Sequence, residues 1–162
     1  MKFFRPQPPP GFEVKDVIVE GNIIVGCEAA VTFVNADGSR FSRNTVYCPT
    51  NYVVRILQET TARDFVPSRK GVVTDNIIVF RLAKLYGAVN EGPGTEPKTF
   101  KFARNWWYCE DNPAGSRLEL PVPEDNGIYG KDPQFVDASG GDFHPKEGSP
   151  ATSVGAFSLK PK

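Results

Sequence analysis

The chain has 162 residues, and its 19 lysines and arginines balance its 19 aspartates and glutamates. This length suits one domain with a buried core, and a formal net charge of zero gives no overall field that would attract nucleic acid or an anionic membrane. Fifteen glycines and 15 prolines, set between clusters of Val, Ile, Phe and Tyr, predict short strands separated by many turns.

Residues 1–12 (MKFFRPQPPPGF) predict a proline-rich leader ahead of one domain at 13–162. The leader contains no apolar run of the roughly 7–15 residues that a secretory signal needs. No stretch of the sequence approaches the ~18 apolar residues of a membrane span. As written, the sequence therefore predicts a cytoplasmic protein without a membrane partner, unless a targeting segment has been removed from it.

Four asparagines, Asn22, Asn44, Asn76 and Asn105, mark an internal repeat. Each follows a strand-like run and precedes a second run of β-branched or aromatic residues. The spacings between them are 22, 32 and 29 residues, and the surplus over 22 falls within Thr60–Lys70 and Asn90–Lys98. Insertions confined to one turn, with the remaining register kept, are typical of a solenoid.

The asparagines themselves suit a tight bend between strands. Asparagine tolerates a left-handed backbone better than most residues, so we expect the bend at the asparagine. Stacked one strand spacing apart, the four amides would form a structural ladder of hydrogen bonds along the solenoid. The competing fold is a β-sandwich, which would need hairpin dipeptides between its strands, and Asp37-Gly38 is the best of these.

Three cysteines, Cys27, Cys48 and Cys109, form no CxxC motif and cannot all pair with one another. Zinc ligation and a disulfide framework are therefore not expected. The sequence predicts three buried free thiols that act as small apolar groups.

Residues 132–156 carry a resemblance to a known superfamily. Residues 132–138 (DPQFVDA), 141–144 (GDFH), 148–151 (GSPA) and 155–156 (GA) resemble the C-terminal signature of pectate-lyase-like β-helix proteins. The resemblance implies an all-β, right-handed parallel β-helix of about five coils, with an irregular C-terminal tail that covers the last coil. The chain departs from the pattern at Pro145, in its small number of coils, and in having a leader where the superfamily has a capping helix.

In this superfamily the substrate lies along the outer face of one parallel sheet. Counting from the asparagines assigns four segments to that sheet: Ala29–Val34, Tyr52–Gln58, Leu82–Tyr86 and Ser116–Leu120. Alternation of the side chains then points Thr32, Arg55, Lys84 and Arg117 outward, one above the next. By the same alternation, at most one of Trp106 and Trp107 faces outward.

The outward cations suggest a binding site for an acidic polysaccharide. Its candidate residues are Arg55, Lys84, Tyr86, Arg63 from the Thr60–Lys70 loop, and Arg117. Arginine pairs with carboxylates in a bidentate manner, and tyrosine offers an apolar face to a sugar ring. Neither long loop carries the clustered acids of a calcium site, so we expect no metal and no cofactor.

Three functions remain open at this stage. The first is a non-catalytic saccharide-binding module or orphan remnant of a polysaccharide-modifying enzyme. The second is an active lyase or epimerase on an acidic glycan, which the missing coils disfavour, and no catalytic residue is assigned. The third is a structural or protein-interaction solenoid. In each case the first coil, near Val14–Val19, has open strand edges. The sequence therefore predicts a homo-oligomer in which the N-terminal ends or the leaders shield each other.

Overall fold

Short β-strands account for most of the regular structure in residues 11–159, the part of the chain that this computed structural model describes. The predicted all-β class is confirmed. The only helical segments there are the 3₁₀ turns η1 (Pro97–Thr99), η2 (Pro113–Gly115), η3 (Pro150–Ser153) and η4 (Ala156–Ser158). None of these has the length and apolar composition needed to cross a membrane. The predicted leader, residues 1–12, lies outside the described residues except for Gly11 and Phe12.

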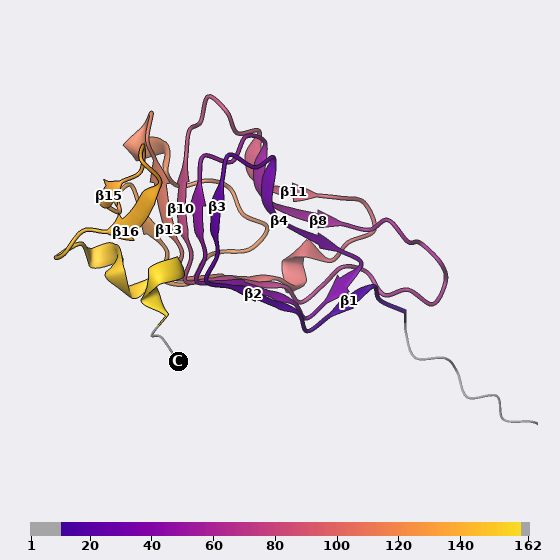
Figure 1. Cartoon of the computed structure of the whole chain (residues 1–162). Helices are drawn as coiled ribbons and strands as arrows, with labels where there is room; N and C mark the ends of the chain where they lie inside the picture. Colours follow the sequence, from indigo (N-terminus) through magenta and orange to yellow (C-terminus); the bar gives the residue numbers. More distant parts are fainter. Residues whose placement is uncertain (1–10, 160–162) are drawn as a thin grey trace, which may run out of the picture.

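Three parallel sheets make up the body of the domain (Figure 1). The five-stranded sheet contains, in spatial order, β14 (Ile128–Tyr129), β13 (Trp106–Cys109), β10 (Ile77–Phe80), β7 (Thr45–Tyr47) and β3 (Ile23–Val25). The four-stranded sheet contains β12 (Lys101–Ala103), β9 (Val72–Thr74), β6 (Arg40–Ser42) and β2 (Ile18–Glu20). The three-stranded sheet contains β11 (Gly87–Glu91), β8 (Tyr52–Leu57) and β4 (Ala29–Val34). A further parallel pair joins β1 (Val14–Lys15) to β5 (Ala36–Asp37).

The chain visits the three sheets in a repeating order. After β2, β3 and β4 it returns to the four-stranded sheet as β6, and each new strand pairs in parallel with the strand one pass earlier. The surplus residues lie, as predicted, in the same connection of each pass, between the three-stranded and four-stranded sheets. The second insertion begins at Gly92 rather than Asn90, because Asn90 and Glu91 belong to β11.

The four repeat asparagines stack with their amides in one line. Asn22 Nδ2 donates to Asn44 Oδ1 (2.9 Å), Asn44 Nδ2 to Asn76 Oδ1 (3.2 Å), and Asn76 Nδ2 to Asn105 Oδ1 (2.8 Å). The backbone N–H of each donor asparagine binds the same oxygen, at 2.8–3.1 Å. The predicted amide ladder is therefore present, and it ends on a carboxylate, because Asn105 Nδ2 donates to Glu124 Oε1 at 2.7 Å.

At each bend, the residue before the asparagine has the left-handed backbone conformation. The expectation that the asparagine itself adopts this conformation is therefore wrong. Gly21, Arg43, Asp75 and Arg104 have φ values of 73°, 52°, 58° and 53°. The ladder explains the difference, since it directs each asparagine's N–H and amide along the stack. The preceding residue must then adopt the left-handed conformation of the bend, which costs roughly 1–2 kcal/mol for a residue other than glycine.

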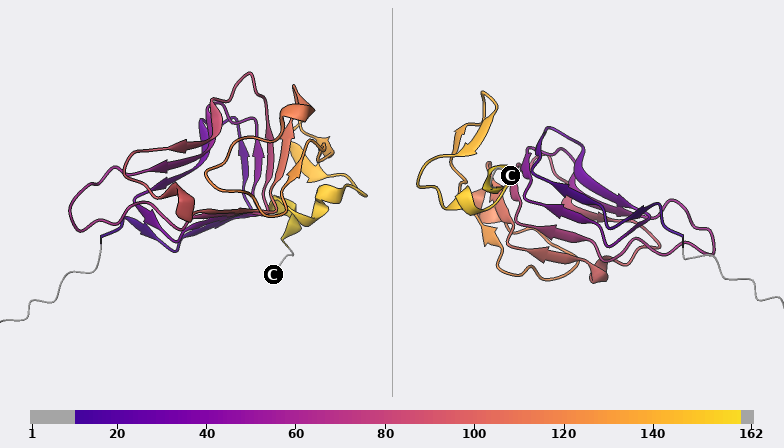
Figure 2. Two further views of the ribbon diagram at one scale, coloured as in Figure 1. Left: turned by 180° about the vertical axis from the view of Figure 1, so that it is seen from behind. Right: turned by 60° about the horizontal axis from the view of Figure 1, so that its bottom comes forward.

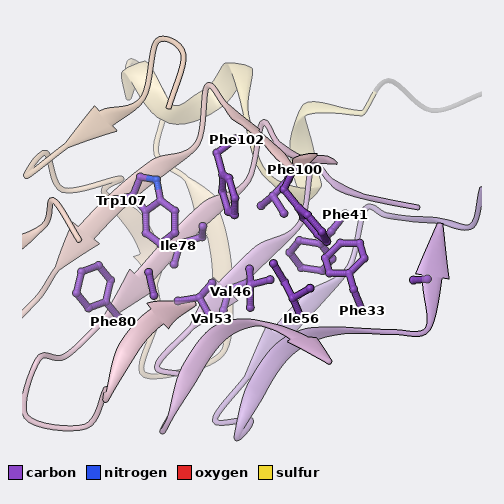
Figure 3. Packing of buried hydrophobic residues seen from close by; sticks show 14 of the residues in the cluster. Phe33, Phe41, Val46, Val53, Ile56, Ile78, Phe80, Phe100, Phe102 and Trp107 are labelled. Atoms are coloured by element: carbon purple, nitrogen blue, oxygen red, sulfur yellow. The ribbon is translucent and has the colours of Figure 1, made fainter. Parts of the chain in front are cut away.

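Apolar side chains from all three sheets meet in one core (Figure 3). Phe33 and Phe100 pack edge to face with their ring centroids 5.2 Å apart, and Phe80 packs in the same way against Trp107 at 6.5 Å. Aromatic pairs of this geometry add to the stabilisation from burial. The core therefore extends from Phe33 on β4 to Trp107 on β13.

Residues 116–125 close the C-terminal end of this core. Leu118, Leu120 and Val122 pack against it, and Asp125 forms a parallel bridge with Ala103. The prediction that Ser116–Leu120 is a strand is wrong, because this segment has no strand partner in the described residues. Two prolines, at 121 and 123, remove N–H donors from the segment that follows it.

The C-terminal tail lies on the outer face of the five-stranded sheet, next to strands of several passes that include β13 and β14. It begins with the antiparallel hairpin of β15 (Phe135–Asp137) and β16 (Asp142–Pro145). Ala151 and Val154 then pack on outward-facing Ile77 and Trp106, forming a second core. Trp106 and Trp107 are thus both buried, one under the tail and one in the main core.

Glycine is required at position 155, where the tail crosses the sheet. Its φ is 78°, and its N–H donates to Asp75 O at 2.8 Å. A Cβ atom there would lie 2.7 Å from Ile77 Cδ1. The GA dipeptide of the tail motif therefore reflects the close approach of the tail backbone to Asp75 and to the side chain of Ile77.

Candidate functional site

Arg55 lies on the outer face of the three-stranded sheet, but the predicted row of cations does not continue from it. Its neighbours in register are Thr32 on β4 and Asn90 on β11. Arg55 Nε donates to Asn90 Oδ1 at 3.4 Å. The position expected to hold Lys84 is therefore held by an asparagine.

Lys84 and Tyr86 lie in a turn, because the strand begins at Gly87 and not at Leu82. The carboxylate of Asp111 accepts the backbone N–H groups of Leu82 and Ala83 at 2.9 and 3.1 Å, which holds the chain in this turn. Tyr86 is 79% exposed, and its ring lies 6.0 Å from that of Tyr52. The sequence around Leu82 contains no signal of this contact with a carboxylate 29 residues later.

The other two candidates also lie apart from Arg55. Arg63 is an exposed residue of the long loop between β8 and β9. The guanidinium of Arg117 lies over the ring of Tyr129, 4.8 Å from its centroid. The structure thus does not bring the five predicted residues together as one stripe.

A different sheet carries a row of cations. Figure 2 (right) shows the four-stranded sheet with the bottom of the molecule turned forward. The outer face of this sheet carries a hollow of about 410 Å³. The polar and charged residues that line it are Glu20, Arg40, Ser42, Arg43, Thr74, Asp75, Lys101 and Arg104. Four of these are cations and two are carboxylates, so the hollow is basic.

Strand alternation accounts for this basic groove. Arg40 on β6 and Lys101 on β12 occupy the same register position, with Val72 of β9 between them. The next residues, Phe41 and Phe102, point inward and are fully buried. Since successive side chains point to opposite faces, burial of the two phenylalanines directs Arg40 and Lys101 to solvent.

The corner residues before the asparagines add the other charges. Arg104 forms a bidentate ion pair with Asp75, with both N–O distances at 2.7 Å. Burial alone would raise the pKa of Asp75, but hydrogen bonds from Arg104 and Thr74 outweigh it and lower the pKa overall. Asp75 is therefore ionised at neutral pH and neutralises Arg104.

The remaining cations of the groove have little internal compensation. Neither Arg40 nor Arg43 forms an ion pair with any residue in 11–159, and both are exposed. Lys101 Nζ lies 3.9 Å from an Asp125 oxygen, but both side chains are well exposed, so this pair is weak. Three cations are thus available to an anionic ligand across the sheet.

A second hollow, of about 660 Å³, lies between the five-stranded sheet and the β15–β16 hairpin. Its lining includes Tyr108, Glu110, Asp132, Phe135 and Lys146. Glu110 is already engaged, since it accepts from Tyr47 Oη and from Arg81 Nε, both at 2.9 Å. Burial, reinforced by Glu110, raises the pKa of Tyr47 to about 12, so this phenol remains protonated at neutral pH and donates to Glu110. The ring of Tyr47 packs against Phe135 and Phe143 of the hairpin.

The three cysteines are free, as predicted, and only Cys109 is fully buried. Burial raises the pKa of all three thiols, and the charge of Glu110 raises that of Cys48 further. Since the thiolate is the reactive form, we expect slow labelling at neutral pH. An Ellman titration is expected to find three thiols in denaturant and a native rate more than tenfold lower. Equally fast native labelling would contradict this picture.

The sequence contained the signal for the basic groove. Ser39-Arg40-Phe41 and Phe100-Lys101-Phe102 precede two of the repeat asparagines, and each sets one cation beside buried phenylalanine. Arg43 and Arg104 directly precede those asparagines. The register count that placed the cationic face on another sheet passed over these four residues.

Comparisons of the chain with protein-family models, with curated proteins and with solved structures give no match. The candidate site is therefore argued from its own geometry and charge.

Proposed function

We propose that this protein is a non-catalytic module that binds an acidic polysaccharide along the outer face of its four-stranded sheet. The observation that carries the proposal is the basic groove, in which Arg40, Arg43 and Lys101 are exposed and have at most weak ion pairs within the described residues. Parallel strands lie about 4.8 Å apart, so cations on β6 and β12 are about 10 Å apart. An extended polyanion laid across the strands can reach both.

The residue types also favour a carboxylate ligand. Guanidinium groups bind carboxylates through two parallel hydrogen bonds, whereas an ammonium acts as a point charge. The hydroxyl of Ser42, on the groove floor, can in addition bind a sugar hydroxyl. A polyuronate supplies both kinds of group at regular intervals.

We further infer that the three parallel sheets form a right-handed parallel β-helix of the pectate-lyase-like type. Support comes from strands that pair in parallel one pass apart and from the amide ladder at one corner. Crossover connections between parallel strands are right-handed in nearly all proteins. The tail motifs that resemble this superfamily agree with the inference, although fold alone does not assign an activity.

A matched pair of double variants tests the binding face. Arg40→Gln/Lys101→Gln removes two charges from the groove, and we expect it to weaken polyuronate binding about tenfold, as measured by isothermal titration calorimetry. Arg55→Gln/Lys84→Gln removes two charges elsewhere and is expected to bind like the parent. Binding should also weaken with added salt, since exposed charges are screened. Unchanged affinity in the first variant would refute the groove as the site.

A panel of polyuronates and neutral glycans separates the module from the other functions. The proposal predicts a thermal shift with polyuronates alone and no new absorbance from unsaturated product. Release of such a product would instead identify a lyase. A panel without any shift would leave a structural or protein-interaction solenoid as the better reading.

A further inference from the structure

The N-terminal end of the three sheets is open. Strands β2, β3 and β4 are each the last strand of their sheet, and each has a strand neighbour on one side only among the described residues. Figure 1 shows the three strands at the same end of the molecule, in the indigo and purple part of the chain. Unpaired N–H and C=O groups along strand edges of this kind recruit further strands.

Apolar side chains accompany these open edges. Val19 points toward the core from β2, in register with Phe41, yet it is 37% exposed while Phe41 is fully buried. On the outer faces of the same edge strands, Ile18 of β2 and Ile23 and Val25 of β3 are 57%, 43% and 54% exposed. A small apolar pocket of about 110 Å³ opens beside Val19, and its lining includes Val14, Val17, Val31 and Phe33. The valines that share this pocket form a contiguous apolar surface at the open end, and such a surface marks an interaction site.

The opposite end cannot stack on this one. Leu118, Leu120 and Val122 pack over the core there, and the carboxylate of Glu124 ends the amide ladder. An acceptor-only group offers no donor to a further amide. Head-to-tail association into a filament is therefore blocked at the C-terminal end.

The leader is also a poor cover for the open end. Four of its residues, Pro6, Pro8, Pro9 and Pro10, lack the N–H that a strand edge needs. The chain enters the domain through Gly11, which forms a parallel bridge with Phe65 of the long loop rather than with β2, β3 or β4.

We propose that two copies of this chain associate through their open N-terminal ends, about a two-fold axis. Viewed from its own N-terminal end, the chain of each copy passes from sheet to sheet in the same rotational sense. When two such ends face each other, the edge strands of one copy therefore run in the opposite direction to those of the other. Strands that meet across the axis would therefore pair antiparallel, with the apolar residues of each end covering the other. A two-fold contact of this kind is closed and stops at a dimer.

Light scattering coupled to size exclusion tests the proposal with the full chain. We expect a particle of twice the 17.8 kDa chain mass. Val19→Lys should yield monomers, because it places a charge in the contact. Val136→Lys alters a valine of similar exposure (49%) in the β15–β16 hairpin and should leave the dimer unchanged. Circular dichroism and thermal unfolding check that both variants fold.

Three results would overturn the dimer. These are a parent chain that stays monomeric at high concentration, assemblies whose mass keeps growing with concentration, or a folded Val19→Lys variant that remains dimeric. Hydrogen exchange provides a second measurement, since amides of β4 that face the open end should exchange more slowly in the dimer than in the Val19→Lys variant. Equal exchange in the two would place the contact elsewhere.

Discussion

Replacing Asn76 with alanine is expected to lower the free energy of unfolding by about 4 kcal/mol. The side chain is fully buried in the middle of the amide ladder. Its Oδ1 accepts from the backbone and the side chain of Asn44, and its Nδ2 donates to Phe41 O and Asn105 Oδ1. Each bond contributes about 1 kcal/mol, and buried partners left without a bond add to the loss.

Two companion variants show whether the loss comes from the ladder. Asn22→Ala, at the exposed open end, should cost only about 1 kcal/mol, because water can replace its bonds. Asn76→Asp keeps the acceptor but loses the donor and introduces a charge among buried groups, so it should be at least as harmful as the alanine. Chemical denaturation of all three measures the differences. Equal losses at Asn22 and Asn76 would contradict the ladder as the cause.

The asparagine repeat was readable from sequence because one physical constraint acts on every pass. A side-chain amide can accept from one neighbour and donate to the other, so the same residue type recurs on each pass. The same repetition allowed the strands on either side of Asn44, Asn76 and Asn105 to be predicted. It also located the two insertions, since residues added in one connection do not disturb the stacked register.

The predictions of local structure failed where residues far along the sequence determine the backbone conformation. The strand expected at Leu82–Tyr86 is a turn because the carboxylate of Asp111 binds two of its N–H groups. The tail crosses the five-stranded sheet because Ile77 and Trp106 are apolar on their outward face. Alternation predicts which side chains face outward but not where a strand begins or what covers it, and the predicted row of cations on the three-stranded sheet therefore does not form.

The end of the repeat was the least visible feature in the sequence. Glu124 follows Asn105 by 19 residues, shorter than any earlier spacing, and it differs from the asparagines in type. Its role follows from the direction of the ladder, in which every amide donates toward the C-terminal end. The aligned N–H groups present a partial positive charge there, and a carboxylate that only accepts is the matching terminus.

Replacing Glu124 with alanine should accordingly cost about as much as breaking the ladder in its middle. Its Oε1 accepts from the backbone and side chain of Asn105, and its Oε2 accepts from Trp107 Nε1 and Tyr129 Oη, both at 2.7 Å. Bonds to a charged acceptor are stronger than neutral ones, and Asn105 and Trp107 are buried donors that would lose their partner. We expect a loss of about 4 kcal/mol in the free energy of unfolding.

The Glu124→Gln variant separates the effect of the side chain's charge from the effect of its shape. Glu124→Gln keeps one oxygen for Asn105 but turns an NH₂ group toward the indole N–H of Trp107, so two donors would face each other. We expect roughly half the loss of the alanine variant, together with a change in tryptophan fluorescence from the disturbed indole. Glu119→Ala, an exposed glutamate on the same segment, is the matched control and should be neutral. Because only the terminus of the ladder is altered, the variant should still bind the polyuronate once folded. A Glu124→Ala protein as stable as the control would mean that the carboxylate does not close this end of the domain.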